Sequence, residues 1–407
     1  MGWCVLYLTR EEERILAGEE GEARAKALEV IVKVGEAVGA ERLIPIKHAH
    51  VSGASYMTIG DAGLRFLARL AESGAMFSVP TTVNPVSYDV EEPGAIPMVR
   101  LSPRIVKAQG EILRALEAMG ADLILTCTPY YTEVPRRVGL REGDSVAWGE
   151  SSAVAYANSV LGIHTNREGG PLALMAGIAG RTYFYGAHDP EWRKPRVAYR
   201  LETPKVLDET EAGVLGEVIA TQHRDEHPPL LDAPLGGEAA LKELSAAVGS
   251  AGSLAMVHIT GVTPGDPGDM IEEFVTMDYG DLARRMEDLA PGFEPDILYV
   301  GCPHASIEEL RRLYRALSKA GERAGGRTVV SISRSLYLQA LREGLVEKLK
   351  GLGVRFVRDS CLIVSPFSGS ARGVRVATNS YKAYFYLSKK GVEVGLAPIE
   401  ALPKLVS

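Results

Sequence analysis

The sequence predicts an α/β fold in which parallel strand–helix units surround a central cleft. In the last third of the chain, apolar stretches that fit strands alternate with amphipathic stretches that fit helices, at 296–301, 306–320, 328–332, 335–350 and 354–357. In addition, Cys127, Cys302 and Cys361 each follow an apolar stretch. The carboxyl ends of parallel strands meet at the crevice where ligands bind, so we expect the three thiols at one cleft.

In the rest of the chain, the expected helices, strands and loops also fit an α/β fold, but they alternate less regularly. Helices are expected at 18–40, 58–70 and 103–119, a strand at 76–80, polar loops at 48–56 and 81–89, and a loop leading into a helix at 148–162. Ser306 followed by Glu309 forms a capping-box pattern, so a helix is expected to begin just after Cys302. The positive end of that helix is expected to lower the pKa of the Cys302 thiol.

Length and composition indicate a globular protein with several subdomains. The chain has 407 residues, of which 46% are hydrophobic and 24% charged, which is enough for two or three domains. A proline-rich stretch at 225–234 reads either as a connection between subdomains or as an ordinary surface loop. On the first reading, one catalytic region spanning 1–407 divides into approximate subdomains at 1–225, 226–290 and 291–407.

Charge and cysteine usage exclude several classes of protein. The net charge of −7, without a basic run, argues against nucleic acid or an anionic membrane as the partner. No apolar stretch is long enough to span a bilayer, and the apolar start is too short for a secretory signal. Four cysteines without a Cys-x-x-Cys pair form neither a disulfide framework nor a zinc ribbon. We therefore expect a cytoplasmic protein.

The three strand-end cysteines allow two interpretations. Thiolates gathered at a cleft can hold a metal or an iron–sulfur cluster with one coordination position open to substrate. Alternatively, Cys127, Cys302 and Cys361 are buried structural residues, since free cysteine is among the most buried residue types. Cys4 is more simply explained by packing than as a fourth ligand. The residues by themselves leave both interpretations open.

Several longer strings are chemically unusual. They are His50-Val-Ser-Gly-Ala-Ser-Tyr-Met-Thr-Ile-Gly, Asn84-Pro-Val, Cys127-Thr-Pro-Tyr, Trp148-Gly-Glu-Ser-Ser-Ala-Val, Thr165-Asn-Arg-Glu-Gly-Gly-Pro, Gly301-Cys-Pro-His, Asp359-Ser-Cys and Thr378-Asn-Ser-Tyr-Lys. Together they resemble the aconitase X family, over about residues 8–402. The resemblance implies an aconitase-like architecture of several subdomains and a hydro-lyase activity.

The resemblance also implies a cofactor. Family members use an oxygen-sensitive iron–sulfur cluster, which implies a [4Fe-4S] cluster, or [3Fe-4S] as isolated, held here by Cys127, Cys302 and Cys361. Familiar aconitases draw two ligands from a Cys-x-x-Cys pair, which this chain lacks. The wide spacing agrees with aconitase X and departs from standard aconitases.

The architecture of the family suggests a partner and a substrate. Bacterial members are often single chains with a fused swivelling domain, whereas archaeal members are split into two subunits. Because the matching region ends close to Ser407, the chain resembles the large subunits, and we expect a small swivel-domain subunit that supplies a serine as the catalytic base. The implied reaction dehydrates (R)-5-phosphomevalonate to trans-anhydromevalonate 5-phosphate in a modified mevalonate pathway of isoprenoid synthesis.

Two other functions stay open. The first is dehydration of 3-hydroxyproline or another small hydroxy acid by the same chemistry. The second belongs to another class, a non-catalytic iron–sulfur sensor that has kept the scaffold.

Candidate substrate-binding residues gain weight from the family match. They are Gly53, Ala54, Ser55, Asn84, Pro85, Ser380 and Lys382, with Glu150, Asn158 and Arg167 as weaker candidates. Small residues at a helix N-terminus let backbone N–H groups approach an anion, and lysine or arginine can bind phosphate or carboxylate. The alternatives are ordinary turns at the first five, a solvated charge at Lys382 and structural hydrogen bonding at the weaker three. His304, beside Cys302, reads equally as an acid or a residue that supports the ligands, or as a helix-capping or packing residue.

Overall fold

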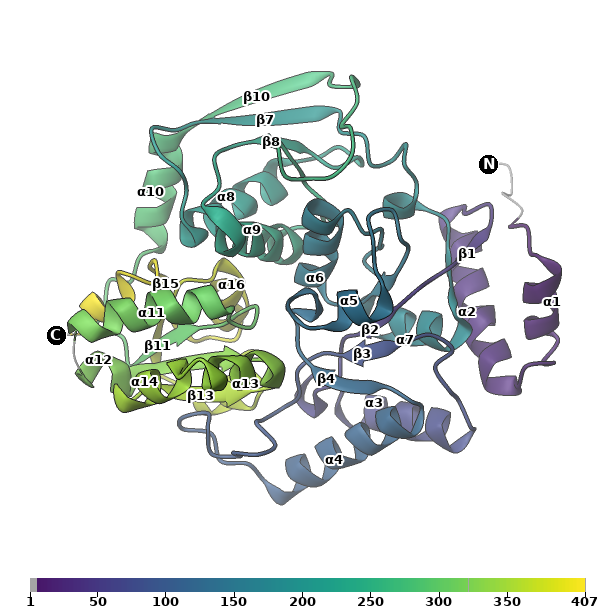
Figure 1. Ribbon diagram of the computed structural model, residues 1–407, viewed down its shortest axis with the longest axis horizontal. Helices are drawn as coiled ribbons and strands as arrows, with labels where there is room; N and C mark the ends of the chain where they lie inside the picture. Colours follow the sequence, from purple (N-terminus) through teal and green to yellow (C-terminus); the bar gives the residue numbers. More distant parts are fainter. Residues whose placement is uncertain (1–5, 321, 407) are drawn as a thin grey trace.

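The computed structural model describes residues 6–320 and 322–406. Three parallel sheets, each covered by its own helices, are arranged around a common centre (Figure 1). The first unit lies at the right of the view, the second at the top and the third at the lower left (Figure 1). The predicted α/β class is confirmed.

The first unit is built on a parallel sheet with the strand order β4-β3-β2-β5. Its strands are β2 (Ala49–Val51), β3 (Thr81–Val83), β4 (Asp122–Leu125) and β5 (Ala147–Trp148), and a separate antiparallel pair joins β1 (Leu43–Pro45) to β6 (Arg181–Tyr183). Its helices are α1 (Arg10–Leu16), α2 (Glu22–Val38), α3 (Tyr56–Glu72), α4 (Pro103–Ala118), α5 (Val134–Val138), α6 (Ser151–Tyr156) and α7 (Gly169–Ala179), with short turns η1 (Pro129–Tyr131), η2 (Ala157–Leu161) and η3 (Gly186–His188). Helices α2 and α7 pack together, as do α3 and α4, and their apolar faces form the core of the unit.

The second unit has the strand order β10-β7-β8-β9, again parallel. Its strands are β7 (Val197–Glu202), β8 (Leu230–Asp232), β9 (His258–Ile259) and β10 (Glu273–Asp278), and its helices are α8 (Glu209–Gln222), α9 (Gly237–Ala251) and α10 (Tyr279–Leu289). Helices α8 and α9 are buried almost all round because they pack against each other and also against neighbours from both other units. The expected boundary near residue 225 falls between α8 and β8, inside this sheet.

The third unit confirms the predicted alternation of strands and helices. Its parallel sheet has the order β13-β12-β11-β14-β15. The strands are β11 (Ile297–Val300), β12 (Thr328–Ile332), β13 (Arg355–Arg358), β14 (Arg375–Thr378) and β15 (Glu393–Leu396). The helices are α11 (Ile307–Ala320), α12 (Glu322–Arg327), α13 (Arg334–Arg342), α14 (Leu345–Gly351), α15 (Phe367–Ser370) and α16 (Tyr381–Lys389), with a final turn η4 (Leu402–Leu405). Strands β11 and β12 are buried along their whole length, as expected for central strands of a parallel sheet.

Three local predictions were wrong. Residues 76–80 do not form the expected strand, which begins at Thr81 as β3, and residues 49–51 of the expected loop at 48–56 form strand β2. Both strands carry buried polar side chains, and in the sequence such residues resemble a loop. The single helix expected at 335–350 is divided into α13 and α14, because Gly344 between them adopts a left-handed φ of 68°.

The three units meet through helices. Helix α6 of the first unit and α16 of the third both pack on α9, and α6 lies near the middle of the molecule (Figure 1). The segments that follow β4, β11 and β13 are thereby brought toward one region. None of the helices in the described ranges is long and apolar enough to cross a membrane.

Candidate active site

The three strand-end cysteines line one cavity of about 660 Å³. Cys127 follows β4 of the first unit, whereas Cys302 and Cys361 follow β11 and β13 of the third. Their exposed fractions are 8%, 4% and 6%, and none of them is in a disulfide. The cavity therefore lies between two units, and both contribute sulfur. Cys4 lies outside the described residues.

The donor set fits an iron–sulfur cluster better than a single ion. Among the residues that the structure describes, no three His, Cys, Asp or Glu side chains are placed to hold one metal ion. A cluster is held by cysteine thiolates on its several iron atoms, so its ligands need not converge on one point. Three buried, unpaired thiols around a cavity suit a cluster with three protein ligands.

The expected lowering of the Cys302 pKa is wrong. Burial raises the pKa of the Cys302 thiol well above its ordinary value, and burial also raises the pKa of Cys361, and that of Cys127 to about 12. Desolvation disfavours the thiolate more strongly than the nearby positive charge of Lys382 favours it. These thiols consequently need a bound metal to lose their protons, as coordinating thiols do.

Two features fix the loop that carries Cys302. Gly301 has a φ of 109°, and a Cβ there would lie 2.1 Å from the carbonyl oxygen of Ser331, so only glycine fits this close approach to β12. Ser380, which caps α16, donates a hydrogen bond to the Cys302 carbonyl. The predicted residue Ser380 thus holds the backbone of Cys302 and is not among the cavity-lining residues.

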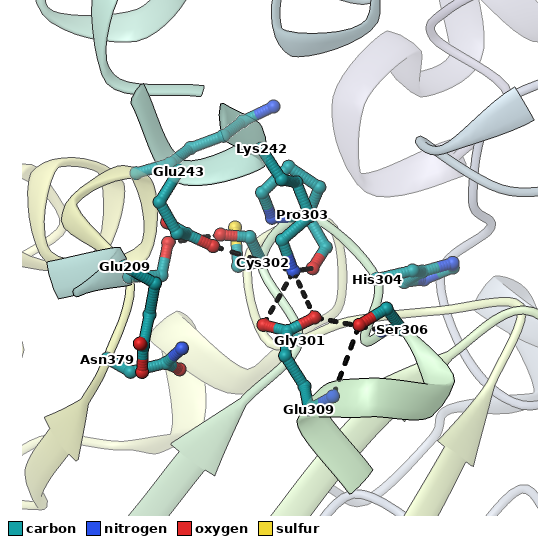
Figure 2. A network of polar contacts seen from close by, with 12 residues as sticks. Glu209, Lys242, Glu243, Gly301, Cys302, Pro303, His304, Ser306, Glu309 and Asn379 are labelled. Atoms are coloured by element: carbon teal, nitrogen blue, oxygen red, sulfur yellow. Dashed lines mark hydrogen bonds and ion pairs between the residues drawn. The ribbon is translucent and has the colours of Figure 1, made fainter. Parts of the chain in front are cut away.

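A buried ion pair contacts the same loop at the residue after Cys302. The Lys242 ammonium lies 2.7 and 2.6 Å from the two carboxylate oxygens of Glu309 and donates to the Pro303 carbonyl at 3.3 Å (Figure 2). Glu309 also accepts from the backbone N–H of Ser306, and Ser306 Oγ accepts from the N–H of Glu309, which confirms the predicted capping box. Although burial opposes its charge, Glu309 raises the pKa of Lys242.

Glu243 adds a second carboxyl group to this ion pair. Its Oε1 lies 3.6 Å from the ammonium of Lys242, and its side chain is 1% exposed. Burial raises the pKa of Glu243 to about 8. Lys242 opposes this shift, but its ammonium also pairs with Glu309, and the nearby negative charge of Glu309 raises the pKa of Glu243 further. Figure 2 shows Glu243 beside Cys302, on the side of the loop away from His304.

His304 joins all three cysteine segments. Its backbone N–H points to Cys127 Sγ at 3.3 Å, its Nε2–H donates to the Ser360 carbonyl at 3.1 Å, and its Nδ1 accepts from Thr126 Oγ1 at 3.0 Å. Burial lowers the pKa of His304 to about 4, so the ring is neutral at neutral pH. In this structure His304 is a buried, neutral residue whose hydrogen bonds connect the segments that carry the cysteines.

The cavity lining also carries charge. Lys382, which is 6% exposed, forms an ion pair with Glu150 and donates to Ser152 Oγ at 3.0 Å. Asn84 donates to the second oxygen of Glu150 at 2.6 Å. Burial by itself would raise the pKa of Glu150, but Lys382 lowers it to about 2, so the pair stays charged. Lys382 is therefore not the solvated surface charge of the alternative interpretation.

The N-terminus of α3 forms another part of the wall. Gly53, Ala54 and Ser55 line the cavity together with Pro85. Gly53 has a φ of 81°, and Ser55 is the N-cap of α3, accepting from the N–H of Met57 at 3.2 Å. A helix N-terminus with small residues before it is a favourable place for an anionic group.

Besides Ser380, two further predicted residues lie outside the cavity lining. The side-chain amide of Asn158 donates to the carbonyls of Val154 and Thr165, and its oxygen accepts from Arg193 at 2.9 Å. Arg167 donates to two carbonyl groups at the end of α9, each at 3.1 Å. Both side chains hold segments of the fold together in this structure.

Sequence reasoning missed several cavity residues. Tyr386 and Lys390 line the cavity beside Lys382, and their spacing of four residues places all three on one face of α16 and its end. This spacing was the signal that could have found them. Lys390 donates to the Ile363 carbonyl at 2.5 Å.

Comparison with known proteins agrees with this architecture. Family models named Aconitase X first, second and third domain match residues 5–191, 195–287 and 295–404. The chain belongs to the aconitase X family. The three matched ranges coincide with the three sheets, and the resemblance seen in the sequence is confirmed.

Individual relatives extend the comparison. The chain is 98% identical over 402 residues to the phosphomevalonate dehydratase large subunit of Aeropyrum pernix, covering 99% of this chain and 100% of that protein. It is 32% identical to a cis-3-hydroxy-L-proline dehydratase of Pseudomonas aeruginosa, covering 92% of this chain but 65% of that protein. The crystal structure of Thermococcus kodakaraensis aconitase X in its holo-form matches with a TM-score of 0.87 and 38% identity, covering 99% of this chain and 100% of that chain.

Proposed function

We propose that this chain is the large subunit of a hydro-lyase that dehydrates (R)-5-phosphomevalonate to trans-anhydromevalonate 5-phosphate. The observation that carries the proposal is the one cavity lined both by three buried thiols and by the Lys382–Glu150 pair. The 98% identity to a relative named for this reaction supports the choice of substrate.

A cluster bound by Cys127, Cys302 and Cys361 would supply an open iron as a Lewis acid for the departing hydroxyl group. The chain itself binds and orients the substrate. Lys382 offers a cation, Asn84 offers one amide hydrogen, and the N-terminus of α3 offers backbone donors to carboxylate or phosphate oxygens. The mostly apolar remainder of the cavity limits water around the reacting atoms.

We further propose that a small subunit completes the site and contributes the base. The chain covers 65% of the P. aeruginosa relative, whose remaining length can hold a further domain. Met57 and Phe66 line the cavity and are 45% and 46% exposed, which leaves apolar surface at its mouth. Such surface is typical of an interaction site. A reducing cytoplasm suits the three unpaired thiols.

The decisive experiment is an anaerobic assay. The chain, reconstituted with iron and sulfide, is mixed with its small subunit and (R)-5-phosphomevalonate, and loss of one water is followed by mass spectrometry. Water loss that requires both subunits is expected. An intact cluster with no water loss would contradict the proposed substrate.

The cluster is tested separately by iron content. Cys127→Ser, Cys302→Ser and Cys361→Ser are each expected to lose most of the bound iron while keeping the native circular dichroism spectrum. Cys4→Ser is the matched control and should load as the native chain does. Unchanged iron in any of the first three variants would remove that residue from the ligand set.

The second candidate is dehydration of cis-3-hydroxy-L-proline, favoured by the relative at 32% identity. This substrate carries one carboxylate and no phosphate, so it needs fewer cationic contacts than Lys382 and Lys390 can offer. Turnover of the proline derivative in the same assay, without turnover of the phosphorylated acid, would establish it. Cluster loading without turnover of either compound would instead favour the sensor.

A further inference from the structure

A chain of buried hydrogen bonds runs from the first sheet to the Lys382–Glu150 pair. The pairing of the strands brings its members together, because His50 on β2 lies opposite Thr82 on β3 and opposite Trp148 on β5. His48 lies two residues before His50 and so points to the same side of the strand. All four side chains are completely buried.

The contacts are continuous. Trp148 Nε1 lies 3.0 Å from His48 Nδ1, His48 Nε2 lies 3.4 Å from Thr82 Oγ1, and Thr82 Oγ1 lies 2.7 Å from His50 Nδ1. His50 Nε2 then lies 2.8 Å from Asn84 Oδ1. The Asn84 amide nitrogen closes the chain on Glu150 Oε2, at 2.6 Å.

The chemistry of its two ends fixes the direction of every bond. An indole N–H can only donate, so His48 Nδ1 accepts from Trp148 and the proton of His48 lies on Nε2. At the other end an ionised carboxylate can only accept, so Asn84 must turn its NH₂ group to Glu150 and its oxygen to His50. His50 therefore carries its proton on Nε2, and the Thr82 hydroxyl accepts from His48 and donates to His50 Nδ1.

Burial agrees with this assignment. It lowers the pKa of His48 to about 3 and that of His50 to about 4, so both rings are neutral at neutral pH and carry one proton each. Each member of the chain then has the one donor and the one acceptor that its neighbours require, and no polar atom of either ring is left unpaired.

We propose that His50 is a positioning residue for substrate binding, which holds the Asn84 amide so that its NH₂ group, and never its oxygen, is turned to Glu150 and the cavity. One amide hydrogen is used by Glu150, and the other is available to a ligand because Asn84 lines the cavity. This edge of the cavity consequently selects an acceptor, a carboxylate or phosphate oxygen, over a hydroxyl or ammonium donor. The inference rests on the proposed function only for the identity of that ligand.

The test compares three variants of the reconstituted two-subunit enzyme with the native form. In His50→Leu, Asn84 Oδ1 loses its donor, and KM for (R)-5-phosphomevalonate is expected to rise about tenfold, the equivalent of one buried hydrogen bond. The change should fall on KM, with kcat little affected, because the contact is made in the ground state and transition state alike. His50→Gln, whose amide can donate to Asn84, should recover most of the native KM.

His188→Leu is the matched control. His188 is another buried histidine, 3% exposed, whose Nδ1 lies 3.2 Å from Ser145 Oγ and which is not among the cavity-lining residues. Its loss is expected to lower the melting temperature without moving KM. An unchanged KM in a folded His50→Leu enzyme, or equal KM values for His50→Leu and His50→Gln, would overturn the proposal.

A measurement on the unaltered protein separates this inference from the proposed function. Neutron diffraction from a deuterated crystal locates each exchangeable deuteron without any substrate or variant. Deuterons on His48 Nε2 and His50 Nε2 are expected, with both Nδ1 atoms bare. A deuteron on His50 Nδ1 would refute the assigned direction even if the enzyme dehydrates phosphomevalonate, and the expected pattern would stand even if it does not.

Discussion

The substitution Lys242→Met tests whether the ion pair behind the Cys302 loop stabilises the fold. Methionine matches the length of the lysine stem but removes the ammonium. Glu309 would then keep a carboxylate in a site where its side chain is fully buried, with Glu243 close by and no cation between them. The Pro303 carbonyl would lose a donor as well.

The size of the effect follows from the burial. Removing one partner of a buried ion pair costs about 3–5 kcal/mol, because the remaining charge is left without compensation. For a chain of 407 residues, an unfolding entropy of about 2.1 cal/mol/K per residue amounts to roughly 0.85 kcal/mol/K. The melting temperature of Lys242→Met is therefore expected to fall by about 4–6 °C.

The assay is thermal unfolding followed by circular dichroism, with iron content measured on the same samples. The double variant Lys242→Met/Glu309→Leu should regain most of the lost stability, since replacing both charges by apolar groups is often neutral. A deficit of about 1 kcal/mol should remain, because the Ser306 N–H loses the carboxylate of the capping box. Iron loading should fall in the single variant and recover in the double one.

An exposed pair provides the control. Lys26 and Glu22 on α2 form an ion pair at 2.5 Å with side chains that are 69% and 82% exposed, and solvent screens such pairs so that they contribute little to stability. Lys26→Met should therefore melt within about 1 °C of the native chain. If Lys242→Met behaves like Lys26→Met, or if the double variant is no more stable than the single one, the reasoning about this buried pair is refuted.

Three further outcomes are expected. The pKa of Glu243 is raised to about 8 from an ordinary 4.5, so ionisation of Glu243 lowers the stability of the native protein as pH rises between those values. Glu243→Gln should therefore have the native melting temperature below pH 4.5 and a higher one than the native protein at pH 8. An equal difference in melting temperature at both pH values would contradict this. Gly301→Ala brings a Cβ to 2.1 Å from the Ser331 carbonyl oxygen and places alanine at a left-handed φ. We therefore expect the free energy of unfolding to fall by about 1–3 kcal/mol and iron loading to fall as well. Native iron loading and native stability would instead show that β11 and β12 can move apart to accept the methyl group. Arg167→Gln should lower the melting temperature but leave KM unchanged, because the guanidinium binds backbone carbonyls, and a raised KM would instead place Arg167 at the substrate.

Local patterns were enough to predict much of the third unit. The alternation of strands and helices, the strand-end cysteines and the Ser306–Glu309 capping box all depend on residues close together in the chain, and the structure has them as predicted. The first sheet was harder to predict, because β2 and β3 are short and place His50 and Thr82 in the interior. Polar residues in a strand resemble a loop until their cross-strand partners are known.

The sequence by itself determined the family and the strand-end positions of the three cysteines, and most of the site residues predicted from it line the cavity, although many other lining residues were not predicted. Only the tertiary structure decided how deeply those residues are buried and whether they are charged. Lys382 is charged and buried because Glu150, 232 positions away in the chain, lies against it. The thiols have raised pKa values because packing removes water from them. Both effects depend on neighbours from distant segments and on the local dielectric, which no short stretch of sequence specifies.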